Sequence, residues 1–124
     1  MSTKILIVDG DPRMRELLKT VLRKEGFMVA GEARNGQAAL TQADKLRPEV
    51  VCMEVDLPDM CGLEVLKIIL EKMPQARVIV ISADASVSKV RDAVGCGAAG
   101  YILKPFNQVR VGTAVRAALK DARA

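Results

Sequence analysis

Short runs of apolar, largely β-branched residues recur five times along the chain, and a segment with helical periodicity follows each run. The runs begin near Ile5, Phe27, Val50, Val78 and Tyr101. Runs of this length are typical of buried strands, whereas apolar residues spaced three and four apart predict amphipathic helices. The pattern therefore predicts five successive strand and helix pairs.

The predicted helices carry start and stop signals. In the first helix, Asp11 is a suitable N-cap, Pro12 suits the first helical position, and Gly26 lies just past the end. The later helices are expected from Asn35 to just before Pro48, from Leu63 to Met73, from Ser86 to Val94, and from near Asn107 along an apolar stripe that reaches Ala122. This last stripe leaves no linker, so we expect residues 1–124 to form one domain without an output domain.

Five strand and helix pairs with right-handed crossovers predict an α/β fold of the flavodoxin-like, doubly wound type. The expected parallel sheet has five strands in the order 2-1-3-4-5. A leucine-rich solenoid has a similar period, but its L-x-x-L-x-L pattern is absent. In open sheets of this kind, function is expected at the carboxyl ends of the strands, around the switch point between the first and third strands.

Composition narrows the class of protein. Half of the residues are hydrophobic but only 2% are aromatic, which suits the aliphatic core of a helix-covered parallel sheet. The formal charge is +4, and the basic residues are scattered rather than gathered in a stripe, which argues against direct nucleic-acid binding. No apolar run is long enough to span a membrane and no signal-peptide pattern is present, so we expect a cytoplasmic protein without membrane contact.

The cysteines Cys52, Cys61 and Cys96 are odd in number and lack C-x-x-C spacing, and the chain has no histidine. These features argue against a disulfide framework and against a zinc site. We therefore expect three reduced cysteines that serve as packing residues.

Polar residues follow four of the five predicted strands. They are Asp9 and Asp11, on either side of Gly10, after the first, Glu54 and Asp56 after the third, Ser82 and Asp84 after the fourth, and Lys104, just before Pro105, after the fifth. Because parallel strands end at one edge of the sheet, these groups should converge there. Carboxylates, a hydroxyl and a lysine suit Mg²⁺ together with a phosphoryl group. The alternative is an ion-paired cluster of loop residues without a ligand.

Four segments, "ILIVD", "LPDMCGLEVL", "VIVISA" and "GYILKPF", resemble in order and position the receiver domain of two-component response regulators. The resemblance covers the whole chain. It implies a metal pocket that includes Asp9, Glu54 at the phosphoacceptor position, a metal-ligating backbone carbonyl at Asp56, a switch pair of Ser82 and Tyr101, and Lys104 as the partner of the acceptor carboxylate and the phosphoryl group. It also implies a cis bond before Pro105.

Two positions depart from the family pattern. Glu54 stands where the family has its acceptor aspartate, four residues before Pro58, and Gly10 replaces the second acid of the metal pocket. The extra methylene of a glutamate displaces its oxygens by about 1 Å, enough to slow phosphoryl transfer. Asp11 is a candidate replacement acid, although helix capping is its better-supported role. We expect only weak Mg²⁺ binding at Asp9, Glu54 and Asp56.

These departures favour a pseudo-receiver, a non-enzymatic module that signals without phosphorylation. Glu54 would then stand in for a phosphorylated aspartate, drawing Ser82 toward it and Tyr101 inward, or would lie flat against Lys104 and leave Tyr101 exposed. The alternative is a conventional receiver phosphorylated with Mg²⁺. The Asp9-x-Asp11 pattern also resembles haloacid-dehalogenase-like phosphatases, but no late acidic pair is evident.

The resemblance also implies partners. Receivers accept their signal from a sensor histidine kinase or a phosphotransfer protein. They pass it to a downstream target protein through the face formed by the fourth helix, fifth strand and fifth helix. A homodimer is a further possibility, and the sequence names neither the pathway nor the target.

Overall fold

The computed structural model, which describes residues 3–120, confirms the predicted α/β fold. Five strands form one parallel sheet: β1 (Lys4–Val8), β2 (Met28–Ala33), β3 (Val50–Glu54), β4 (Arg77–Ser82) and β5 (Gly100–Leu103). Their order is β2-β1-β3-β4-β5, as predicted. The sheet therefore has its switch point between the neighbouring strands β1 and β3, whose carboxyl ends lie side by side.

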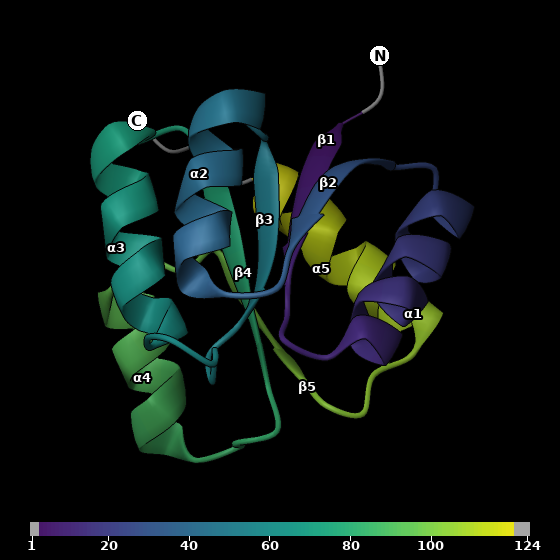
Figure 1. The fold of residues 1–124 in the computed structure, drawn as a ribbon. Helices are drawn as coiled ribbons and strands as arrows, with labels where there is room; N and C mark the ends of the chain where they lie inside the picture. Colours follow the sequence, from purple (N-terminus) through teal and green to yellow (C-terminus); the bar gives the residue numbers. More distant parts are fainter. Residues whose placement is uncertain (1–2, 121–124) are drawn as a thin grey trace.

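A helix follows each strand: α1 (Pro12–Lys24), α2 (Gly36–Leu46), α3 (Gly62–Lys72), α4 (Val87–Gly95) and α5 (Gln108–Lys120). Figure 1 shows α1 and α5 on one face of the sheet and α2, α3 and α4 on the other. Alternate residues of β1 serve the two faces, since Ile5 and Ile7 pack with α1 and α5 whereas Leu6 and Val8 pack with α2 and α3. Two aliphatic layers thus cover the sheet.

The helix starts agree with the capping signals in the sequence. The side chains of Asp11, Asn35 and Ser86 accept hydrogen bonds from backbone N–H groups in the first turns of α1, α2 and α4. The Asn107 side chain does the same for Arg110 at the start of α5. The third helix begins one residue earlier than predicted, at Gly62. Ala122, the predicted end of the last stripe, lies outside the described residues.

The prediction that all three cysteines are packing residues is wrong for Cys61. Cys52 is fully buried in β3, and burial raises the pKa of its thiol to about 12. Cys96 is half-buried at the end of α4, but Cys61 is exposed at the N-cap position of α3. The stretch around Cys61 turns from loop to helix, so its apolar neighbours do not imply a buried side chain.

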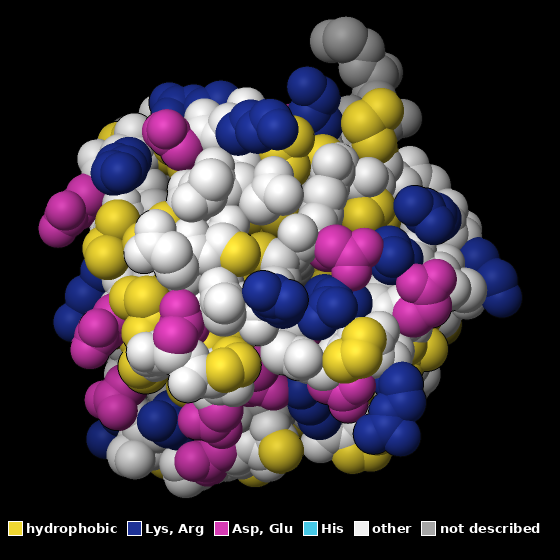
Figure 2. Space-filling model, in the orientation of Figure 1, with side chains coloured by type: hydrophobic (Ala, Val, Ile, Leu, Met, Phe, Trp, Pro, Cys, Tyr) yellow, Lys and Arg dark blue, Asp and Glu magenta, His cyan; other side chains and the backbone are white. Residues whose placement is uncertain are grey.

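The surface of the molecule is mixed in charge. In Figure 2, Asp and Glu side chains gather along the lower edge, beneath the carboxyl ends of the strands, with Lys and Arg among them. In the part of the chain that the structure describes, no helix combines the length and apolarity needed to cross a membrane.

Candidate functional site

The carboxyl ends of four strands bring the predicted polar residues to one edge of the sheet. Asp9 follows β1, Glu54 ends β3, Ser82 ends β4 and Lys104 follows β5. Asp9 and Ser82 are the buried polar residues of the sheet edge, with 4% and 2% of their surface exposed. The peptide bond between Lys104 and Pro105 is cis, in agreement with the sequence-based expectation.

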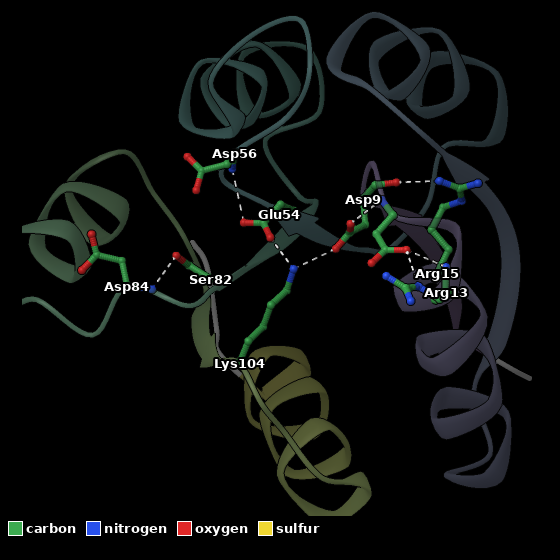
Figure 3. Close-up of polar contacts among 9 residues, drawn as sticks. Asp9, Arg13, Arg15, Glu54, Asp56, Ser82, Asp84 and Lys104 are labelled. Carbon is green, nitrogen blue, oxygen red and sulfur yellow. Dashed lines mark hydrogen bonds and ion pairs between the residues drawn. The ribbon is translucent and has the colours of Figure 1, made fainter.

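Lys104 joins the two acids at the centre of the site (Figure 3). Its Nζ donates to Asp9 Oδ2 at 3.1 Å and also to Glu54 Oε1. Burial disfavours the ammonium form, but the hydrogen bonds to Glu54 and Asp9 outweigh burial, so the pKa of Lys104 is raised above its usual value. The three side chains thus form a charged, largely solvent-shielded bridge between the ends of β1, β3 and β5.

The remaining polar atoms of Asp9 are also engaged. Its Oδ1 accepts a hydrogen bond from the Asp11 N–H at 2.8 Å, and its backbone carbonyl accepts one from Arg15 Nη1 at 2.8 Å. The Asp11 carboxylate accepts from the Arg13 N–H at 2.9 Å, and this bond lowers the Asp11 pKa. Asp11 therefore caps α1, and its side-chain oxygens are directed to the helix rather than to Lys104.

Glu54 is held by the loop that follows it. Its Oε2 accepts a hydrogen bond from the Asp56 N–H at 3.2 Å, while the Asp56 side chain is exposed. The proposed role of the Asp56 carbonyl as a metal ligand stays a prediction.

The loop after Glu54 lies close to the loop after β1. A β-carbon at Gly10 would lie 3.2 and 3.3 Å from Pro58 Cγ and Cδ, which is tighter than most contacts of this kind. Gly10 therefore accommodates the ring of Pro58.

Ser82 and Tyr101 meet at a third residue, Asp84. Ser82 Oγ accepts from the Asp84 N–H at 3.0 Å, and the Tyr101 hydroxyl donates to the Asp84 carbonyl at 2.7 Å. In Figure 3 the Ser82 hydroxyl is directed to Asp84, on the opposite side of Glu54 from Asp9. Tyr101 is half-buried and packs against the core beneath α4. The arrangement matches neither expected outcome in full, since Glu54 pairs with Lys104 while Tyr101 is half-buried.

Asp59 is a residue of this region that the sequence did not single out. Its two carboxylate oxygens accept hydrogen bonds from the N–H groups of Gly36 at 2.7 Å and Gln37 at 3.0 Å. These bonds lower the pKa of Asp59. The loop after Glu54 is thereby attached to the start of α2. No local pattern signals such a contact, because its partners are more than twenty residues apart in the chain.

The residues present do not fit a divalent cation in this arrangement. Across residues 3–120 there is no group of three or more Asp, Glu, Cys or His side chains placed to hold a metal ion. All four carboxylate oxygens of Asp9 and Glu54 already accept hydrogen bonds from within the protein. Mg²⁺ needs carboxylate oxygens together with several waters in a near-octahedral arrangement, and here those oxygens face an ammonium and two backbone N–H groups.

Comparison with known proteins agrees with this fold. The model of the response regulator receiver domain family matches residues 5–116. The chemotaxis protein CheY of Thermotoga maritima is 40% identical over 111 residues, which cover 90% of this chain and 92% of that protein. The CheY of Bacillus subtilis is 40% identical over 119 residues, covering 96% and 99% of the two chains.

Solved structures show the same similarity. The receiver domain of NarL from Mycobacterium tuberculosis superposes with a TM-score of 0.91 at 30% identity and covers 98% of each chain. CheY of Borrelia burgdorferi, in a complex with CheX, BeF3 and Mg²⁺, superposes with a TM-score of 0.91 at 28% identity, covering 94% of this chain and 89% of that one. The chain is therefore a member of the response regulator receiver domain family.

Proposed function

We propose that this receiver domain signals through protein contacts without being phosphorylated. The supporting observation is Glu54, which by the family resemblance stands at the acceptor position and is already paired with Lys104. A phosphoryl group would have to enter next to a carboxylate that is longer than aspartate and engaged at both oxygens. On this proposal the chain is a binding module and not an enzyme, and its cytoplasmic location stays a prediction.

The half-buried position of Tyr101 supports the same proposal. A receiver switch is expected to turn this aromatic inward when the acceptor is charged, and here the Tyr101 hydroxyl donates to the Asp84 carbonyl. Ser82 contributes through Asp84 and not through a bond to Glu54. A carboxylate carries one charge where a phosphoryl group carries nearly two, so the resulting bias toward the signalling state is partial.

The output surface of this proposal is the face formed by α4, β5 and α5. It exposes large apolar side chains from each of these elements: Val87 and Val94 on α4, Leu103 on β5 and Val109 on α5. The proposed partner is a downstream target protein that covers these side chains. A sensor histidine kinase or a phosphotransfer protein is expected upstream of this domain, and a homodimer is an alternative assembly. Any Mg²⁺ binding is weaker than in a receiver with its full acid set, because Gly10 has no carboxylate.

Intact-mass spectrometry after incubation with acetyl phosphate and Mg²⁺ tests the proposal. The unmodified protein should gain no phosphoryl group. A double variant, Gly10→Asp with Glu54→Asp, should gain one, since it restores both acids of the usual pocket. Adding Lys104→Met to the double variant should abolish the gain, which controls for adventitious labelling. Mg²⁺-dependent labelling of Glu54 in the unmodified protein would contradict the proposal.

A further inference from the structure

We propose that the Lys104 ammonium is the resident cation of this site and excludes Mg²⁺ from it. The inference deepens the proposed function and rests on it for the identity of the site. A missing acid at Gly10 by itself would weaken Mg²⁺ binding and leave Asp9 and Glu54 available to the metal. The contacts of Lys104 point to a stronger effect, in which the protein supplies its own positive charge.

The first support is the arrangement of charge. Lys104 Nζ lies between Asp9 Oδ2, at 3.1 Å, and Glu54 Oε1. These two side chains have only 5% and 12% of their surface exposed, and that of Lys104 has 18%. Opposite charges attract strongly where water is largely excluded, and a divalent cation beside the ammonium would be repelled for the same reason. Mg²⁺ can therefore bind these carboxylates only after Lys104 has left them.

The second support is the way in which Lys104 is held. Its backbone N–H donates to the carbonyl of Ser82 at 2.9 Å, which fixes the start of its side chain at the end of β4. Displacement of the ammonium would thus have to come from side-chain rotation alone. If the Lys104 side chain rotated out of the site, its ammonium would lose two charge-assisted hydrogen bonds and contact water instead. Charge-assisted hydrogen bonds are stronger than those between neutral groups.

The third support is the crowding around Gly10 and the occupied oxygens of the two acids. The ring of Pro58 lies against Gly10, within 3.2 Å of the place a β-carbon would take. The second oxygens of Asp9 and Glu54 are occupied by the N–H groups of Asp11 and Asp56. No oxygen of either acid is left that a metal could use without displacing a hydrogen bond.

Thermal unfolding with and without Mg²⁺ tests the inference. In the unmodified protein, MgCl2 should shift Tm no more than NaCl of equal ionic strength. Lys104→Met leaves two shielded carboxylates without a cation, so this variant should have a lower Tm and regain it with Mg²⁺. The apparent Mg²⁺ affinity should rise by about tenfold or more. Lys67→Met, which removes an exposed lysine on α3, is the matched control and should respond to Mg²⁺ like the unmodified protein.

A second measurement needs no variant, in case Lys104→Met does not fold. In ¹⁵N–¹H spectra of the unmodified protein, the backbone signals of Asp9, Glu54 and Asp56 should not shift saturably as Mg²⁺ is added. Saturable shifts at millimolar Mg²⁺, or a Mg²⁺ response of Lys104→Met no larger than that of the unmodified protein, would overturn the inference. Mg²⁺ binding without labelling by acetyl phosphate would overturn it and leave the proposed function intact, whereas labelling of Glu54 would overturn the proposed function itself.

Discussion

At the scale of single residues, Gly62 determines where the backbone of Glu54 can lie. Its N–H donates to the Val55 carbonyl at 2.6 Å, so the start of α3 lies directly against the end of β3. A β-carbon at position 62 would collide with the Glu54 carbonyl and would lie 2.9 Å from Val55 Cα. These contacts are with backbone atoms, which cannot rotate away as the end of a side chain can. The place of Glu54 therefore depends on a glycine in the next element.

Gly62→Ala should destabilise the protein by about 1–3 kcal/mol, the usual range for overpacking a well-filled site. Urea unfolding at equilibrium measures this change as a lower midpoint with an unchanged slope. Gly95→Ala is the matched control, because Gly95 lies in α4 with nothing within 4 Å of the added carbon. That control should be neutral or stabilising by about 0.5–1 kcal/mol, owing to the better helix propensity of alanine. Equal effects at both positions would contradict the role assigned to Gly62.

At the scale of elements, the parts of the fold that were predicted well from the sequence are those signalled by neighbouring residues in the chain. The caps Asp11, Asn35 and Ser86 lie next to the helices they start, so each helix began within a residue of its expected place. Contacts between distant elements carry no such signal. For example, the Glu25 carboxylate at the end of α1 accepts hydrogen bonds from Gln108 and Arg116 of α5, and periodicity does not reveal which polar residues of two helices will meet.

The hydrogen bonds of Asp59 lead to a prediction at this scale, because they attach the loop after β3 to the start of α2. Backbone N–H groups of Gly36 and Gln37 lower its pKa in the folded protein, while in the unfolded chain it has its ordinary value near 3.8. A lowered folded pKa contributes stability above the unfolded value, and that contribution is lost as pH falls through the folded pKa. Asp59→Ala should therefore lower stability at neutral pH, and the difference from the unmodified protein should shrink as the pH falls below the ordinary carboxyl value near 3.8.

Urea midpoints of both proteins, measured across this pH range, provide the comparison. Asp44→Ala removes the same charge from the exposed surface of α2, where Asp44 makes only a 3.8 Å ion pair with Arg47. This control should change stability little at any pH. If the stability difference between Asp59→Ala and the unmodified protein stayed the same in acid, the carboxylate charge would not be what attaches the loop to α2.

At the scale of the whole molecule, the site and the α4-β5-α5 face are linked by consecutive hydrogen bonds. Lys104 Nζ pairs with Glu54, the Lys104 N–H donates to the Ser82 carbonyl, and Ser82 Oγ accepts from Asp84. Tyr101 then donates to the Asp84 carbonyl. These residues were predicted from the sequence to lie at one edge of the sheet, because the carboxyl ends of parallel strands meet at the same edge. The sequence did not predict that Asp84 would connect Ser82 to Tyr101, since both bonds use backbone atoms that any residue possesses.

Glu54→Gln tests whether this chain of contacts transmits the state of the site. The amide has no charge, so Lys104 keeps Asp9 as its only ionic partner and is less firmly held at the end of β3. A single charge-assisted hydrogen bond contributes about 1.5–3 kcal/mol, which limits the expected change to a partial shift of Tyr101 from its half-buried position. Tyr101 is the only tyrosine and the chain has no tryptophan, so intrinsic fluorescence reports on this residue alone. Quenching by acrylamide should increase in Glu54→Gln, and binding to a partner of the α4-β5-α5 face should weaken.

Asp56→Asn removes a charge from an exposed neighbouring side chain and should leave the quenching unchanged. Equal quenching in all three proteins would mean that Glu54 has no influence on the switch and is a relic of the acceptor rather than a substitute for its charged form.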